Sequence, residues 1–91
     1  MDKSDFEVFY NPHIKKDLKV FTAKEKDTFF VIINEIIKKD PFKGKKLKGK
    51  FSGLYRFRFG NHRIIYKLDF LNRIIFILRV SHRKDVYDNL I

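Results

Sequence analysis

The dipeptide Gly60-Asn61 and the two alternating runs around it constrain the fold of this chain more than any other feature. Residues 54–59 and 62–68 alternate between apolar or aromatic side chains and mostly basic ones. This period of two is typical of β-strands, whose side chains point to opposite faces in turn, and Gly-Asn favours the two-residue turn of a β-hairpin. The turn sets the cross-strand pairs, which are Phe59 with His62, Arg58 with Arg63 and Phe57 with Ile64. We therefore predict a hairpin with one apolar and one basic face.

A third run, residues 74–80, extends both faces of this hairpin. The apolar face is predicted to contain Tyr55, Phe57, Phe59, Ile64, Tyr66, Leu68, Ile74, Phe76, Leu78 and Val80. The opposite face gathers Arg56, Arg58, Arg63, Lys67 and Arg79. Arg58 opposite Arg63 is destabilising by itself, whereas Arg binds phosphate through two parallel hydrogen bonds. We interpret this face as an anion-binding surface; the alternative is a solvated face whose Arg stems cover Ile65, Ile75 and Ile77.

The first forty residues are predicted to form a strand and two helices. Residues 6–10 are mostly aromatic or β-branched, as in a strand. Asn11 and Pro12 are typical of a helix N-cap and first turn, so a helix is expected to about residue 21. Thr22 and Glu25 match a capping box, which begins a longer helix to about residue 39. A short turn joins the two helices into a hairpin.

The predicted order of elements is β-α-α-β-β-β-α, with the last helix at residues 85–90. This order predicts an α+β fold in which the helical hairpin packs on one face of an antiparallel sheet. The 91 residues are expected to form a single domain, residues 1–91. The chain has no cysteine, so disulfides and thiolate metal sites are excluded. No segment approaches the ~20 apolar residues of a membrane span, and we expect a soluble, cytoplasmic protein.

The positive charge of the chain is confined to its second half. Residues 1–40 contain eight basic and eight acidic residues, whereas residues 41–91 contain thirteen basic and three acidic ones, which accounts for the net charge of +10. A segregated field of this kind attracts polyanions such as nucleic acid, an anionic membrane or an acidic protein. The alternative, a basic surface that only keeps the protein soluble, would favour an even distribution.

The segment after the third run carries groups that can transfer protons or stabilise negative charge. They are His82, Arg83 and Tyr87, and only His has an unperturbed pKa near neutrality. RNA is cleaved when its own 2′-hydroxyl attacks the adjacent phosphate, a reaction that needs a base, an acid and cations for the pentacovalent intermediate. Because no paired acids lie near the basic face, we expect neither a metal nor another cofactor.

These motifs resemble the RelE/ParE superfamily of bacterial and archaeal toxins. The resemblance rests on Leu-Lys-Gly at residues 47–49, then Tyr-Arg-x-Arg-x-Gly-x-x-Arg-x-x-Tyr at 55–66, then His-Arg-Lys-x-Val-Tyr at 82–87. It covers essentially the whole chain. It implies the toxin of a type II toxin–antitoxin system and, in the RelE-like branch, a metal-independent endoribonuclease that cleaves mRNA in the ribosomal A site.

The resemblance also implies roles for individual residues. Arg56 and Arg58 would hold the RNA backbone, and Arg63 would orient the scissile phosphate. The expected catalytic residues are Arg58, Arg63, His82, Arg83 and Tyr87, and the expected RNA-binding residues are Lys46, Lys48, Lys50, Arg56, Lys67, Arg79 and Lys84. Arg stays protonated at neutral pH and is a poor general base, so the identity of the base is left open.

Two other functions are compatible with the same sequence. One is a ParE-like inhibitor of DNA gyrase, and the other is a non-catalytic module that binds RNA or the ribosome. Both toxin interpretations imply a cognate acidic antitoxin that covers the basic face, whereas the RelE-like one adds mRNA and the ribosome as partners. His13 is expected to be an exposed surface residue, and His62 to support the turn rather than catalysis.

Overall fold

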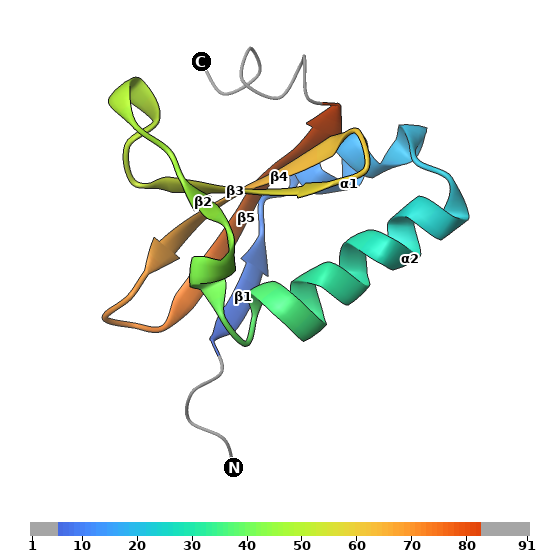
Figure 1. Cartoon of the computed structure of the whole chain (residues 1–91). Helices are drawn as coiled ribbons and strands as arrows, with labels where there is room; N and C mark the ends of the chain where they lie inside the picture. The colour runs from blue at the N-terminus through green and yellow to red at the C-terminus, as the bar shows by residue number, and fades with distance from the viewer. Residues whose placement is uncertain (1–5, 83–91) are drawn as a thin grey trace.

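The computed structural model describes residues 6–82, which form five strands and two helices (Figure 1). The strands are β1 (Glu7–Tyr10), β2 (Lys45–Lys46), β3 (Leu54–Phe59), β4 (His62–Asp69) and β5 (Ile74–His82). The helices are α1 (His13–Asp17) and α2 (Ala23–Ile32), with 3-10 turns at Leu18–Val20, Pro41–Lys43 and Gly49–Phe51 and a π turn at Ile33–Ile37. The predicted α+β class is confirmed. The helix predicted at residues 85–90 lies outside the described residues.

The five strands form one sheet in the order β1-β5-β4-β3-β2. Neighbouring strands from β2 to β5 are antiparallel, but β1 pairs with β5 in parallel. The fully antiparallel sheet predicted from the sequence is therefore wrong at this one edge, because an alternating pattern does not encode the direction of a partner strand at the other end of the chain. The short β2 was also missed, since its two lysines read as part of a basic loop.

The β3–β4 hairpin has the predicted register. Phe59 pairs with His62, Arg58 with Arg63 and Phe57 with Ile64. Gly60 has a φ of 57°, a left-handed conformation that glycine adopts without steric cost. The local turn sequence was sufficient to fix which side chains share a face.

A β-bulge in β5 changes which of its residues face the helices. Tyr66 pairs with Ile77 and Ile65 pairs with Arg79, so Leu78 is an extra residue between them. Ile75, Ile77 and Val80 are fully buried in the core. The prediction that Ile74, Phe76 and Leu78 face the core is wrong, because the inserted residue reverses the alternation before it. The interpretation that Arg stems cover Ile75 and Ile77 is wrong for the same reason.

The helices pack on one face of the sheet and form the core with it (Figure 1). The capping box at the start of α2 is present, with Thr22 and Glu25 bonding each other's backbone N–H. Phe29, Ile33 and Ile37 are fully buried, and burial of each such side chain stabilises the fold by about 1.5–3 kcal/mol. In the part of the chain described, no helix is long and apolar enough to cross a membrane.

Tyr66 anchors the segment before β2 to the sheet. Its buried hydroxyl donates to the Pro41 carbonyl at 2.6 Å and accepts from the Gly44 N–H at 3.1 Å. Burial raises the pKa of Tyr66 well above its usual value, so the hydroxyl keeps its proton. A Cβ atom at Gly44 would lie 2.2 Å from that hydroxyl, so only glycine fits. The clamp fixes the start of the segment that carries the basic residues of β2.

Candidate functional site

The outer face of the sheet, which faces away from the helices, contains most of the predicted basic residues. On it, Arg58 pairs with Arg63 across the β3–β4 hairpin, and Arg56 pairs with Ile65. Lys45 of β2 pairs with Arg56 on the other side. Because paired residues share a face of the sheet, these cations form one surface. We call it the basic cluster, and it comprises Lys45, Arg56, Arg58, Arg63 and Lys67.

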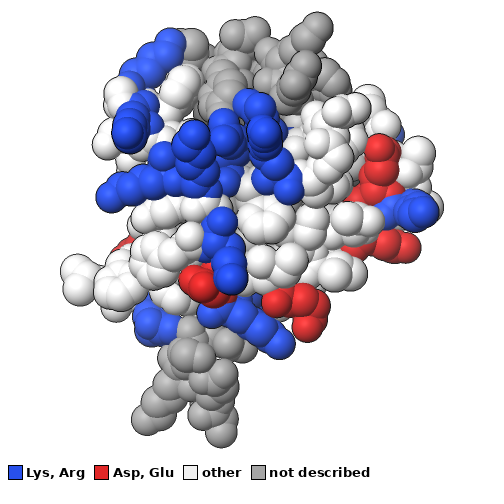
Figure 2. All heavy atoms as spheres, in the orientation of Figure 1, with Lys and Arg blue, Asp and Glu red and all other residues white. Residues whose placement is uncertain are grey.

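The charge of the basic cluster is not balanced by acids on its own strands. Neither β2 nor β3 contains an acidic residue, and in β4 the one acid, Asp69, is the last residue. Figure 2 shows Lys and Arg gathered in the upper left of the view. Most of the Asp and Glu side chains that are visible on this face of the molecule lie below them or to the right. Like charges facing each other on paired strands are destabilising. An anion bound between Arg58 and Arg63 would relieve that repulsion.

Lysines of the β2–β3 segment extend this field beyond the sheet. Lys48 and Lys50 are exposed in the loop between β2 and β3, which projects at the upper left of Figure 1. Lys46 is exposed too, but it pairs with Tyr55 and so has the opposite orientation in the strand. The structure therefore places Lys45, which the sequence reasoning missed, on the outer face in place of Lys46. The strand parity of β2 was the missing signal.

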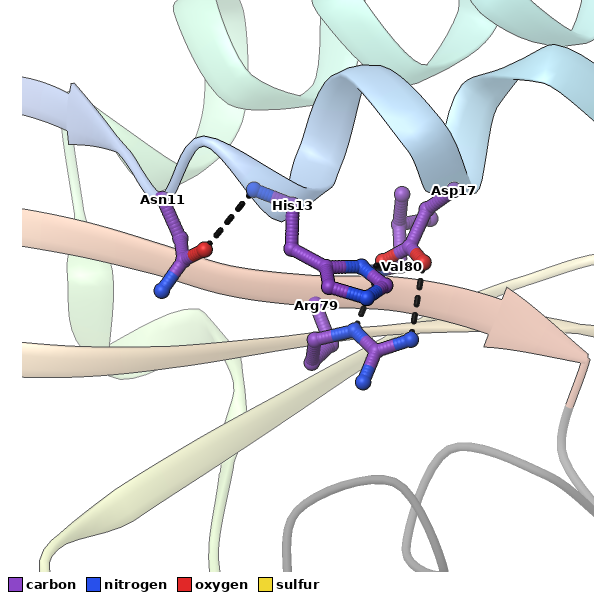
Figure 3. Close-up of polar contacts among 5 residues, drawn as sticks. All are labelled: Asn11, His13, Asp17, Arg79 and Val80. Carbon is purple, nitrogen blue, oxygen red and sulfur yellow. Dashed lines mark hydrogen bonds and ion pairs between the residues drawn. The ribbon is translucent and has the colours of Figure 1, made fainter.

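Arg79 makes a bidentate ion pair with Asp17 of α1 (Figure 3). Its Nε donates to Asp17 Oδ2 at 2.9 Å, and its Nη2 donates to Oδ1 at 2.8 Å. Asp17 also accepts from the Val80 N–H at 3.1 Å and lies 3.1 Å from His13 Nδ1. RNA binding by Arg79 stays a prediction, but the guanidinium already has a structural partner that the sequence did not reveal.

The carboxylate of Asp17 is the centre of this network. Its side chain is only 6% exposed. Burial raises the pKa of Asp17, but the hydrogen bonds from Arg79 and the Val80 N–H, together with the charge of Arg79, outweigh burial and lower the pKa below its usual value. The hydrogen bonds to Asp17 and the negative charge of Asp17 raise the pKa of Arg79 in turn. The predicted exposure of His13 is confirmed, and its ring extends the network to the surface. This network links α1 to the C-terminal part of β5.

His62 has a structural role beside the β3–β4 turn, as predicted. Its Nε2 lies 3.0 Å from Glu25 Oε2, and its ring packs 4.4 Å from the ring of Phe21. Hydrogen bonds from the Thr22 N–H and from His62 lower the pKa of Glu25. His62 therefore links the turn to the start of α2.

Of the remaining predicted catalytic residues, only His82 belongs to β5. It is the last residue of the strand, and its backbone pairs with that of His62. Arg83, Lys84 and Tyr87 lie outside the described residues, so their roles stay predictions. Within residues 6–82, no group of three or more acids and histidines is placed to bind a metal ion.

A family profile and one relative match this chain over most of its length, and a second relative matches about half of it. A sequence profile described as the ParE toxin of type II toxin–antitoxin systems, parDE, matches residues 8–87. RelE1 of Methanocaldococcus jannaschii is 33% identical over 88 residues, which cover 92% of this chain and 97% of that protein. The toxin RelG of Mycobacterium tuberculosis is 39% identical over 44 residues, and the match spans 48% of this chain and about half (51%) of RelG.

The fold has a counterpart among solved structures. The toxin–antitoxin complex RelBE2 of Mycobacterium tuberculosis contains a chain that superposes with a TM-score of 0.81 at 24% identity. The match covers 87% of this chain and 99% of that chain. The likeness confirms the RelE-like arrangement of helices on a sheet. The family profile and the similarity to RelE1 show that this chain belongs to the RelE/ParE superfamily of toxins from type II toxin–antitoxin systems.

Proposed function

We propose that this toxin is a metal-independent endoribonuclease that cleaves mRNA in the ribosomal A site. The basic cluster is the observation that supports the proposal most. It places Arg58 and Arg63 side by side on the outer face of the sheet, flanked by Arg56 and Lys45. Two guanidinium groups in this position suit a phosphodiester, which each can bind through paired hydrogen bonds. Like charges that face each other on paired strands repel, and a phosphate ligand would interact favourably with both.

The proposed chemistry is attack of a 2′-hydroxyl on the adjacent phosphorus, which forms a 2′,3′-cyclic phosphate as the bond to the 5′-oxygen of the next nucleotide breaks and an acid protonates that leaving oxygen. Arg58 and Arg63 stabilise the charge that develops on the phosphate oxygens, and a base removes the proton of the 2′-hydroxyl. His82 is proposed as the acid or base because His titrates near neutral pH, whereas Arg remains protonated. Arg83 would add positive charge, and Tyr87 would stack on a base or assist proton transfer.

An acidic antitoxin is the proposed protein partner, and the proposed site of action is the cytoplasm. Membership in a family of type II toxins supports such a partner. A segment with acidic side chains would neutralise the basic cluster and block access of RNA to it.

Inhibition of DNA gyrase is the second candidate, because the matching family profile is described by its ParE toxin. A gyrase inhibitor acts through protein contact and has no need for paired arginines on an open sheet face. It would leave transcripts intact and cause DNA damage signalling.

Primer extension on mRNAs after brief induction in cells tests the proposal. We expect new 5′ ends inside translated frames with the wild-type chain, and none with Arg63→Ala. The matched control is Lys19→Ala, which removes an exposed cation on the helical side and should cut as the wild type does. Intact transcripts with growth arrest would instead support gyrase, and intact transcripts with normal growth would support a non-catalytic RNA- or ribosome-binding module.

A further inference from the structure

The outer face of the sheet has an aromatic half beside the basic cluster. Phe9 of β1 pairs with Phe76 of β5, and Phe76 pairs with Lys67 of β4, so all three share the outer face. The rings of Phe9 and Phe76 are stacked, with centroids 6.0 Å apart and planes 28° from parallel. Phe9 is 44% exposed. The bulge at Leu78 creates this surface, because it turns Phe76 and Leu78 away from the core.

A shallow groove of about 450 Å³ lies over this aromatic pair. Phe9, Phe76 and Leu78 line it together with Tyr10 and Pro12, and Lys67 is its charged residue. Among residues 6–82, no carboxylate lines the groove. An apolar floor with a cation at its border suits a ligand that is flat and apolar in one part and anionic in another.

The groove continues the basic cluster along β4. Arg63, Ile65 and Lys67 lie on the outer face at two-residue intervals, each about 6.6–6.8 Å along the strand. This interval is comparable to the separation of successive phosphates in an extended single strand of nucleic acid. The next row holds Glu7 and Asp69, both opposite Ile74, and their negative charge ends the path for an anion. Lys67 is therefore the last cation before the acids, and the groove lies beside it.

We propose that this groove stacks an unpaired nucleobase of the RNA whose phosphates lie along the basic cluster. The inference rests on the proposed function, since it assigns a second subsite to the same strand. Unpaired bases stack on aromatic side chains without sequence preference. Lys67 contacts the phosphate that links the stacked nucleotide to the strand held by Arg63. The groove thus holds a nucleotide about two phosphates away from the one between Arg58 and Arg63.

Binding of a short single-stranded 2′-O-methyl RNA carrying 2-aminopurine tests this subsite without cleavage. We expect the wild-type chain to bind it and quench its fluorescence through stacking. Phe9→Ala and Phe9→Leu should weaken binding about tenfold and abolish most of the quenching, whereas Phe9→Tyr should restore both. The matched control is Phe42→Ala, which removes an exposed ring that does not line the groove and should bind as the wild type does.

The outcomes separate this inference from the proposed function. If Arg63→Ala weakens binding and Phe9→Ala does not, the subsite is wrong, and the RNA-cleaving function is unaffected. If Phe9→Ala weakens binding but the wild-type chain cuts no mRNA in cells, the subsite stands and catalysis is wrong. If the wild-type chain does not bind the RNA, the subsite is wrong, and primer extension in cells still decides the RNA-cleaving function by itself. If Phe9→Ala binds the RNA as the wild type does but loses affinity for the antitoxin, the groove is a protein-docking site and the inference is overturned.

Discussion

At the scale of single residues, the pairing of Arg58 with Arg63 is a local conflict between electrostatics and strand pairing. The two residues are directly opposite on paired strands, where like charges repel and opposite charges attract by roughly 0.2–1 kcal/mol. Arg58 is exposed and Arg63 is half-buried, so neither is needed to fill the core. A chain that only had to fold would be more stable with an acid at one of the two positions.

Arg58→Glu should therefore stabilise the fold and abolish toxicity. We expect the free energy of unfolding to rise by about 0.5–1 kcal/mol, since the substitution converts a repulsive cross-strand pair into an attractive one. Urea denaturation measures the stability, and growth after induction measures the toxicity. Arg58→Gln, which only removes the repulsion, should lie between the wild type and Arg58→Glu in stability. A less stable Arg58→Glu would show that Arg58 has a structural role.

At the scale of elements, one buried carboxylate adds a polar link between α1 and β5 to the burial of Ile14 in the core. α1 is only one turn and a half long, and a helix of this length is not stable alone. Asp17, at the end of α1, accepts hydrogen bonds from the Arg79 side chain and from the Val80 N–H. Both residues follow Ile77, the last residue of β5 that pairs with β1. The ion pair therefore holds α1 against the part of β5 that β1 no longer covers.

Asp17→Asn should destabilise the protein by about 3 kcal/mol at pH 7, because Arg79 would lose its charge partner while remaining buried. The pKa of Asp17 is lower in the folded protein than in the unfolded chain. The ionised Asp17 therefore contributes to the free energy of unfolding at pH values above its pKa in the unfolded chain, about 3.9. This contribution is lost as the pH falls through the lower pKa of the folded protein. The measurement is urea unfolding of the wild type and Asp17→Asn at pH 7 and at pH 3.

The difference between these two proteins should shrink at pH 3. Asp27→Asn, at an exposed position of α2, is the control and should match the wild type at both pH values. A destabilisation of Asp17→Asn that is as large at pH 3 as at pH 7 would show that the side-chain geometry, and not the charge of Asp17, holds Arg79.

At the scale of the whole molecule, the charge is divided between the two faces of the sheet. Among the described acids, Glu25, Asp27 and Glu35 lie in α2 and the π turn that follows it, whereas the outer face carries the basic cluster. An RNA strand on the outer face would release one set of counterions for each phosphate that a cation neutralises.

RNA binding should accordingly weaken steeply with salt. For a single strand held by the five cations of the basic cluster, we expect the logarithm of the binding constant to fall with the logarithm of salt concentration with a slope of about −3.5. Arg63→Ala should make the slope shallower by about 0.7, whereas Lys19→Ala should leave it unchanged. Fluorescence anisotropy of a labelled 2′-O-methyl RNA at several salt concentrations measures both slopes. A slope near zero would exclude the basic cluster as the RNA-binding surface.

The sequence by itself determined those features of this protein that depend on neighbouring residues. The Gly60-Asn61 turn specified the β3–β4 register, and thereby placed Arg58 opposite Arg63. Thr22 and Glu25 specified the start of α2. These features are encoded locally, because a turn type or a capping box involves only a few consecutive residues.

The tertiary structure decided everything that depended on distant segments. The direction of β1 follows from packing against β5, and the pairing of β2 with β3 brings Lys45 to the outer face. The bulge at Leu78 reversed the predicted orientation of part of β5, because alternation predicts faces only while no residue is inserted. Asp17 and Arg79 are far apart in sequence, and only the folded chain brings the carboxylate and the guanidinium within hydrogen-bonding distance.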